Sequence, residues 1–132
     1  MAIIARAAGK TKTLTDFFAN GSMATDSLVV FCTFPGVEEA RCIIRDLVEL
    51  KLIACGNIFP VVESIYRWQG LIESASEAFA ILKTTAAAFE HLKVEFKSRH
   101  PYEVPELIAF PIAHGLPSYL AWISENVAVS SE

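Results

Sequence analysis

The sequence has few cysteines, and none of them is in a paired arrangement. Its three cysteines, Cys32, Cys42 and Cys55, are widely spaced and form no C-x-x-C motif. An odd number at this spacing is not a disulfide framework. Unpaired cysteines are typical of proteins kept reduced inside the cell. We therefore expect free thiols and a cytoplasmic protein.

The chain also lacks a long apolar run, although it is rich in apolar residues. Hydrophobic residues make up 53% of the sequence and the mean hydropathy is +0.41. A membrane-spanning helix needs roughly 18 consecutive apolar residues, and the longest runs here, LVVFC and LIAF, are far shorter. The composition therefore argues against a membrane protein and predicts an apolar interface with another protein chain.

Basic residues are scarce outside the first 22 positions. The net charge of the chain is −4, and residues 1–22 contain three basic side chains and one acidic side chain. The acidic charge therefore belongs to the remainder of the chain. A protein that binds nucleic acid usually carries a basic stripe or patch. The absence of one argues against nucleic acid and is compatible with cations or basic partners.

Sequence motifs of catalysis are missing as well. The chain contains no G-x-S-x-G, no phosphate-binding Walker loop and no G-x-G-x-x-G. No cysteine is accompanied by a histidine and an asparagine placed as in a known nucleophile motif. We therefore expect a protein that is not an enzyme.

Residues 1–22 differ from the rest of the chain. They precede a second methionine, Met23, and end in Gly-Ser, as the remnant of a fusion would. Alternatives are a native presequence or a docking peptide, in which Leu14, Phe17 and Phe18 would share one face of a short helix. We expect a leader or tag-like extension over residues 1–22 and a single folded domain over residues 23–132.

Residues 54–85 are predicted to form one long β-hairpin. Gln69-Gly70 separates two runs rich in β-branched and aromatic residues, and a glycine suits the turn between two strands. Strands of some fifteen residues span roughly 50 Å, which exceeds the roughly 35 Å width of a domain of this size. The tip of the hairpin should therefore extend beyond the domain. Because its side chains are apolar, we predict that a second copy of the chain covers them. Pro60 predicts a bulge or kink in the first arm.

The remaining elements flank this hairpin. A buried strand is expected at Ser27–Phe34, a helix at residues 37–52, a helix capped by Thr84 or Thr85 at 86–99, a strand at 104–112 and a short helix at 116–123. The order β-α-β-β-α-β with a trailing helix predicts an α+β, ferredoxin-like sandwich with both main helices on one face of an antiparallel sheet. The bare opposite face is a second reason to expect an oligomer, and we predict a trimer.

Several short motifs occur in the order characteristic of one family: ACGNI at residues 54–58, YRWQG at 66–70, Glu77, Lys83-Thr84, HPYEVP at 100–105, and Gly115 with Tyr119, Leu120, Trp122 and Ile123. They resemble the CutA family, the divalent-cation tolerance proteins, over residues 28–127. The resemblance implies a ferredoxin-like fold, an intertwined homotrimer and a role in metal-ion tolerance or copper binding. Animal members are linked to anchoring of acetylcholinesterase. The trimer also resembles the PII-type signalling proteins, which bind small ligands between subunits.

Three residues are candidate metal ligands. The thiolate of Cys55 suits Cu(I), and the imidazole of His100 could complete such a site, with Glu103 as a carboxylate for a borderline cation. A cysteine near the start of a strand is also commonly a core residue. The turn at residues 100–105 could equally be a helix stop whose polar groups bond a neighbouring subunit.

A second set of residues predicts a ligand cleft. Trp68, Glu77, Lys83 and Tyr102 are polar or aromatic residues next to rigid stretches. We expect the turn at residues 100–103 of one chain to meet the hairpin of the next and to form a concave site there. Alternatively, Lys83 makes a structural ion pair across the trimer with Glu77 or Glu103. The two functional hypotheses are a metal- or small-ligand-binding trimer and a structural or scaffolding trimer.

Overall fold

The computed structural model describes residues 4–7, 10–13 and 25–128. Strands β1 (Ile4–Ala7) and β2 (Lys10–Thr13) form an antiparallel two-stranded sheet of their own. The short helix expected around Leu14 and Phe17 lies outside the described residues. The division of the chain at residues 22 and 23 therefore stays a prediction.

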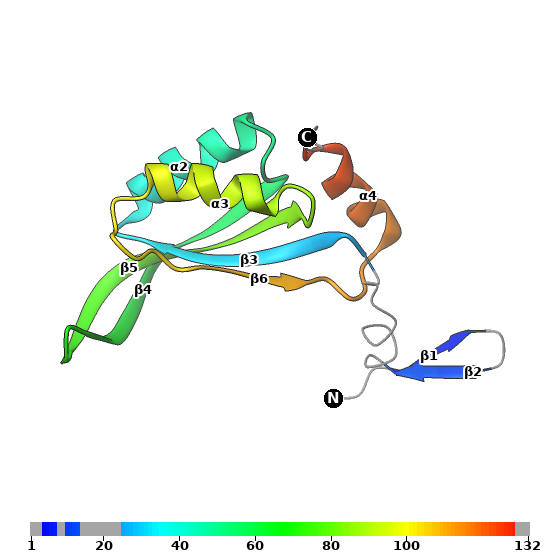
Figure 1. Cartoon of the computed structure of the whole chain (residues 1–132), viewed down its shortest axis with the longest axis horizontal. Coiled ribbons are helices and arrows are strands. Elements are labelled where there is room, and N and C mark those ends of the chain that lie inside the picture. The colour runs from blue at the N-terminus through cyan, green and yellow to red at the C-terminus, as the bar shows by residue number, and fades with distance from the viewer. Residues whose placement is uncertain (1–3, 8–9, 14–24, 129–132) are drawn as a thin grey trace.

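The main body consists of a four-stranded sheet and three helices (Figure 1). Along the chain its elements are β3 (Ser27–Phe34), α2 (Val37–Glu49), β4 (Cys55–Trp68), β5 (Leu71–Thr85), α3 (Phe89–Arg99), β6 (Leu107–Pro111) and α4 (Pro117–Glu125). The strands lie in the order β4-β5-β3-β6, and every neighbouring pair is antiparallel. Helices α2 and α3 lie side by side on one face of the sheet (Figure 1). This arrangement confirms the predicted ferredoxin-like fold.

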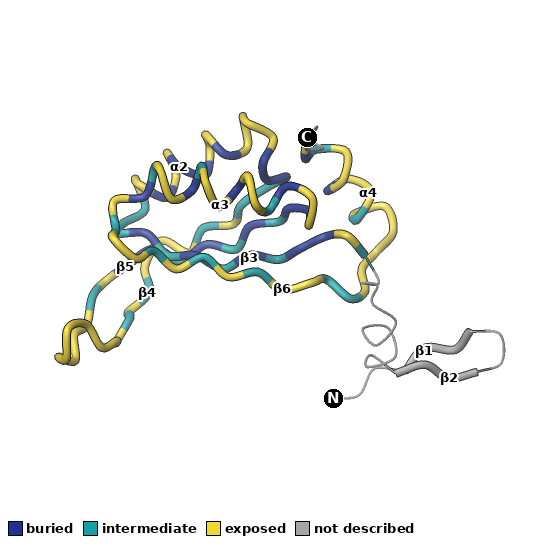
Figure 2. The backbone as a smooth tube through the Cα atoms, in the orientation of Figure 1, coloured by how far each residue is buried: buried dark blue, intermediate teal, exposed yellow. Residues whose placement is uncertain are grey.

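The core lies between this sheet and the two helices, as the buried segments in Figure 2 show. In β3, side chains alternate between the two faces of the sheet. Val30, Cys32 and Phe34 are fully buried on the helix side, where they join Leu47 of α2 and Phe96 of α3. The alternation explains why this largely apolar strand has one buried and one partly exposed face.

Helix α2 ends at Glu49, three residues before the predicted end. Lys51 adopts a left-handed backbone conformation, with φ of 59°. The Lys51 amide donates to the Val48 carbonyl and the Leu52 amide to the Leu47 carbonyl, each at 3.0 Å. These two bonds form a Schellman motif, which satisfies the last carbonyls of the helix and turns Leu52 into the core.

Helix α3 begins at Phe89, three residues after the predicted start. The Ala88 amide donates to the Thr85 hydroxyl at 3.3 Å, so Thr85 caps the turn that leads into the helix. The Thr84 hydroxyl points elsewhere and donates to the Leu52 carbonyl at 2.6 Å. The N-cap of α3 itself is Ala88, which makes no side-chain capping bond, so the predicted cap by Thr84 or Thr85 is wrong for the helix, and Thr85 bonds only in the turn that precedes it.

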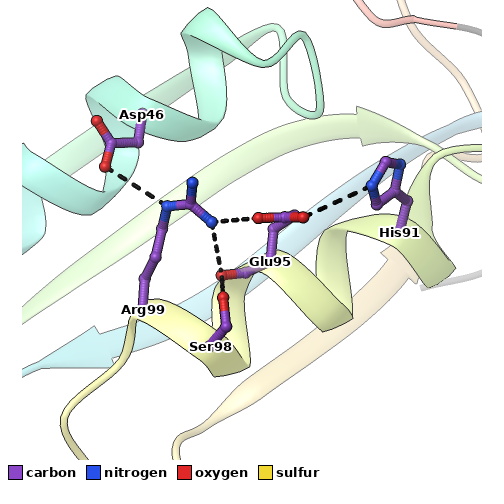
Figure 3. A network of polar contacts seen from close by, with 5 residues as sticks. All are labelled: Asp46, His91, Glu95, Ser98 and Arg99. Carbon is purple, nitrogen blue, oxygen red and sulfur yellow. Dashed lines mark hydrogen bonds and ion pairs between the residues drawn. The ribbon is translucent and has the colours of Figure 1, made fainter.

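A surface network joins the end of α3 to α2 (Figure 3). The Arg99 guanidinium bonds the Glu95 carboxylate and lies 3.5 Å from the Asp46 carboxylate of α2. His91 Nε2 lies 3.7 Å from the same Glu95 side chain. These groups are partly exposed, and exposed pairs contribute little to stability. They connect the last turn of α3, which leads directly into the turn at residue 100, with the surface of α2.

The hairpin matches its prediction in the two-residue turn and in the irregularity at Pro60. Gln69 and Gly70 both have positive φ, of 52° and 83°, as a type I′ turn requires. The pairing of β4 with β5 shifts between Phe59 and Val62, on either side of Pro60. Beyond this bulge the two arms extend past the rest of the sheet (Figure 1).

The sheet face opposite α2 and α3 carries a cluster of phenylalanines. The Phe31 ring lies 5.3 Å from the Phe79 ring and 5.1 Å from the Phe110 ring, between centroids. The Phe59 ring lies 5.8 Å from Phe79. Phe110 is 46% exposed and Phe59 is 48% exposed. In the single chain, the described elements leave this aromatic surface open to solvent.

Candidate functional site

A pocket of about 650 Å³ lies where the hairpin leaves the sheet. Its walls come from the hairpin arms β4 and β5, the end of β3 and the segment that follows α3. The lining residues are Thr33, Ser64, Ile65, Tyr66, Trp68, Glu73, Glu77, Tyr102, Glu103, Val104 and Glu106. The pocket is thus built from three stretches that are distant in the sequence.

The lining of this pocket is acidic and aromatic. It contains four glutamates, and none of the described residues that line it is basic. Glu77 is only 8% exposed, so its carboxylate is nearly enclosed by protein. Burial, and then the charge of Glu77, raises the pKa of Glu106. Four carboxyl groups around one aromatic-walled cavity create a negative potential that attracts cations.

Tyr102 holds the buried carboxylate in place. Its hydroxyl donates a hydrogen bond of 2.6 Å to Oε2 of Glu77. Burial raises the pKa of Tyr102 well above its usual value, and the bond to Glu77 adds to the effect. The phenol therefore keeps its proton and remains a donor, which suits a carboxylate acceptor.

His100 packs against Tyr102 and bonds its backbone amide. Its ring is 7% exposed, stacks on Phe34 and contacts Phe96, with centroids 5.3 and 5.1 Å away. Nε2 lies 2.7 Å from the Thr33 carbonyl oxygen, and Nδ1 lies 3.1 Å from the Tyr102 amide nitrogen. A carbonyl can only accept and an amide N–H can only donate. The ring is therefore the neutral Nε2–H tautomer with both nitrogens occupied, which leaves none for a metal ion.

Cys55 lies at the other end of the sheet. In the sheet, Cys55 pairs with Lys83 of β5, and Lys83 in turn pairs with Val29 of β3. His100 bonds Thr33, which lies four residues further along β3. Four residues of strand span about 14 Å. Within one chain, Cys55 is therefore apart from His100 and from Glu103. No group of three or more His, Cys, Asp or Glu side chains able to hold a metal occurs among the described residues.

The environment of Cys55 contains few metal-binding groups. Its Sγ lies 3.8 Å from the Tyr119 hydroxyl of α4. Lys83 donates from Nζ to Oδ1 of Asn57 at 2.6 Å, on the same face of the sheet. An ammonium group next to the thiol disfavours binding of a cation by charge. Within the single chain Lys83 therefore bonds Asn57, and the ion pair expected across the trimer with Glu77 or Glu103 stays a prediction.

Part of the residue set predicted for a ligand cleft lies together within one chain. Trp68, Glu77, Tyr102 and Glu103 line one pocket, but Lys83 does not. The predicted cleft between neighbouring chains stays a prediction. The other lining residues were missed, among them Tyr66, Glu73 and Glu106. Glu73 could have been found, because residues four apart on a strand share a face, and Glu77 was already a candidate.

Comparison with known proteins identifies relatives over most of the described chain. The profile of the CutA1 divalent ion tolerance protein family matches residues 28–126. The divalent-cation tolerance protein CutA of Thermus thermophilus is 50% identical over 98 residues, which are 74% of this chain and 95% of the relative. The chloroplastic protein CutA of Arabidopsis thaliana is 39% identical over 105 residues, which are 80% of this chain and 58% of the relative.

Solved structures give the same result. The crystal structure of CutA1 from Oryza sativa superposes with a TM-score of 0.78 at 36% identity and covers 80% of this chain and 97% of its own. That of CutA from Xylella fastidiosa superposes with a TM-score of 0.76 at 38% identity and covers 79% of this chain and all of its own. With the family profile matched over residues 28–126 and relatives up to 50% identical, this chain belongs to the CutA1 family of divalent ion tolerance proteins.

Proposed function

We propose that this chain binds divalent cations in the acidic pocket and thereby serves the cation tolerance for which its relatives are named. The observation that carries the proposal is the gathering of four glutamates, one of them nearly buried, around a single pocket. A scaffolding protein has no need to gather like charges, which repel one another. A bound cation would offset that repulsion.

Among the described residues, no three His, Cys, Asp or Glu side chains can ligate one metal ion together, so the cation proposed for this pocket would keep much of its water shell. A pocket of about 650 Å³ is far larger than a bare ion. Carboxylate and hydroxyl oxygens suit hard or borderline cations such as Mg²⁺, Mn²⁺ and Cu²⁺ better than Cu(I). Copper would therefore enter this pocket as Cu²⁺ and not bind through the Cys55 thiol, which lies beside Lys83.

The functional unit in this proposal is a homotrimer. The phenylalanine face of the sheet and the hairpin both present apolar side chains to solvent in the single chain, including Ile65 at 70% and Ile72 at 71% exposure. Covering exposed apolar surface contributes about 25 cal/mol per Å². Because the hairpin arms form one wall of the pocket, assembly through the hairpin would fix the shape of each site.

The proposed role is binding in a reducing compartment, without catalysis. Cys32, Cys42 and Cys55 are free thiols. Burial, and to a lesser extent the charge of Glu106, raises the pKa of Cys32 to about 12, which leaves that thiol unreactive. No helix in the described part of the chain is long and apolar enough to cross a membrane. These features support a cytoplasmic protein.

Replacing Glu77 by glutamine should weaken Mn²⁺ binding by about tenfold or more, because the change removes a nearly buried negative charge. Glutamine has the same shape, and its carbonyl can still accept the Tyr102 hydrogen bond. Isothermal titration with MnCl₂ at neutral pH measures the effect.

Glu90→Gln is the matched control, since that carboxylate lies on α3 with its side chain 82% exposed and outside the pocket lining. It should bind Mn²⁺ as the wild type does. Equal affinity in the Glu77 variant and the wild type, or an equal loss in both variants, would contradict the pocket assignment.

A further inference from the structure

We propose that the acidic pocket also binds organic divalent cations, namely aliphatic diamines that carry a primary ammonium group at each end. The proposal rests on the cation site proposed above and names a second class of cation for it. It follows from one oxygen of the Glu77 carboxylate, from the position of a second carboxylate along the same strand, and from the aromatic and apolar walls beside them.

The Glu77 carboxylate has one oxygen left for a ligand. Its Oε2 atom accepts the hydrogen bond from the Tyr102 hydroxyl, whereas Oε1 accepts no hydrogen bond from any described residue. Glu77 is only 8% exposed, yet no side-chain oxygen or nitrogen of the described chain is both sealed from solvent and without a partner. Because Glu77 lines the pocket, Oε1 is open to it. A ligand with an N–H donor would therefore bind there.

This oxygen suits an ammonium group better than a directly bound metal ion. A metal ion needs several ligands around one point, and no three His, Cys, Asp or Glu side chains among the described residues provide them. A primary ammonium group bonds single carboxylate oxygens strongly through its N–H donors. Alkylamines keep that extra proton at neutral pH, as lysine does. Glu106 lies close enough to interact with Glu77 and adds negative potential at this end of the pocket.

A second lining carboxylate lies further along the same strand. Glu73 precedes Glu77 by four residues on β5, so the two side chains lie on one face of the hairpin. At roughly 3.3 Å per residue, their Cα atoms are about 13 Å apart. One point charge cannot lie close to both carboxylates at this separation. A diamine with six methylene groups is of comparable length and places one positive charge near each of them.

Aromatic and apolar side chains form the walls beside these carboxylates. Tyr66 pairs with Glu73 across the hairpin, and Trp68 follows two residues later, so both rings lie on the face that carries Glu73. Ile65 and Val104 also line the pocket. Methylene groups are stabilised by contact with such surfaces, and aromatic faces attract ammonium groups. A hydrated metal ion gains nothing from apolar walls, so a cation with a hydrocarbon linker fits this lining better.

Isothermal titration at neutral pH with hexane-1,6-diamine, and with hexylamine as the singly charged probe, tests the proposal. The wild type should bind the diamine more tightly than hexylamine. Glu77→Gln should weaken binding of both amines about tenfold or more, because it removes the charge of a nearly buried acceptor. Glu73→Gln should weaken binding of the diamine alone, by about threefold, since Glu73 is exposed and exposed ion pairs contribute little.

Glu90→Gln is the matched control, because that carboxylate is exposed on α3 and lies outside the pocket lining. It should bind both amines as the wild type does. Equal affinities of the wild type for the two amines, or an equal loss of both in Glu73→Gln, would overturn the assignment of Glu73 to the second ammonium group. Amine binding that survives Glu77→Gln unchanged would place the amines outside the pocket and overturn the proposal.

Titrating Mn²⁺ with and without saturating diamine separates failure of this proposal from failure of the proposed function. The diamine should lower the apparent Mn²⁺ affinity of the wild type, since both cations occupy one pocket. A wild type that binds Mn²⁺ but neither amine, or binds Mn²⁺ equally well in saturating diamine, overturns the present proposal and leaves metal binding intact. A wild type that binds the diamine through Glu77 but binds no Mn²⁺ defeats the metal-binding function alone. Binding of neither cation defeats both.

Discussion

Replacing Phe110 by aspartate is expected to convert the assembly into monomers. Phe110 lies in the phenylalanine cluster, 5.1 Å from Phe31 between ring centroids, and is 46% exposed in the single chain. In a trimer that covers this face, the new carboxylate would be buried without a partner, at a cost of several kcal/mol. Light scattering after gel filtration should give three times the 14.5 kDa chain mass for the wild type and a single chain mass for the variant.

Val94→Asp is the matched control for this experiment. Val94 is 63% exposed and lies on α3, on the opposite side of the sheet from Phe110. Its substitution should leave the trimer intact. A wild type that runs as a monomer at micromolar concentration, or a Phe110 variant that stays trimeric, would show that the aromatic face is not the interface.

Replacing Phe96 by alanine should cause the largest loss of stability, about 3–5 kcal/mol per chain. Phe96 is fully buried and contacts Phe34 and His100, with centroids 5.8 and 5.1 Å away. The cavity would therefore form under the turn that carries Tyr102. Urea denaturation at one fixed chain concentration measures the loss, since association also stabilises the folded state.

Val94→Ala, on the same helix, is the comparison for the core substitution. Its side chain is mostly exposed, and surface changes of this kind usually fall within about 0.5 kcal/mol. A Phe96→Ala variant with the unfolding midpoint of the wild type would mean that this part of the core can close around the missing ring.

The hairpin and the sandwich could be predicted because their signals are local. Gln69-Gly70 specifies a tight turn, Pro60 interrupts strand pairing, and the alternation of helix and strand patterns leaves few possible topologies. The end of α2 and the start of α3 could not be located in the same way. Lys51 adopts a conformation that usually requires glycine, so the sequence carries no stop signal there.

The pocket could be predicted only in part, because its composition depends on strand register. Phe34 pairs with Ala78, which places Glu77 at the end of β3, close to where His100 bonds Thr33. That pairing brings the hairpin and the turn together within one chain, and no local pattern encodes it. The exclusion of Lys83 was predictable, since six residues of strand separate it from Glu77 by about 20 Å.

The placement of Cys55 illustrates the same difficulty. Its chemistry alone made it the leading candidate for a soft metal, yet its partners across the sheet and in α4 are Lys83 and Tyr119. Residue type predicts what a side chain can bind, whereas register and loop packing determine its neighbours. In this chain the thiol and the carboxylates lie at opposite ends of the sheet.

The two tryptophans of the chain allow the most direct test of where a cation binds. Trp68 lines the acidic pocket, and Trp122 stacks on Tyr119, the residue that contacts Cys55. Their indole N–H groups give separate signals in ¹H–¹⁵N spectra, and bound Mn²⁺ broadens signals close to it. At low Mn²⁺ concentration, we expect the Trp68 signal to broaden while the Trp122 signal stays sharp. Broadening of Trp122 alone, or of neither signal, would contradict cation binding in the acidic pocket.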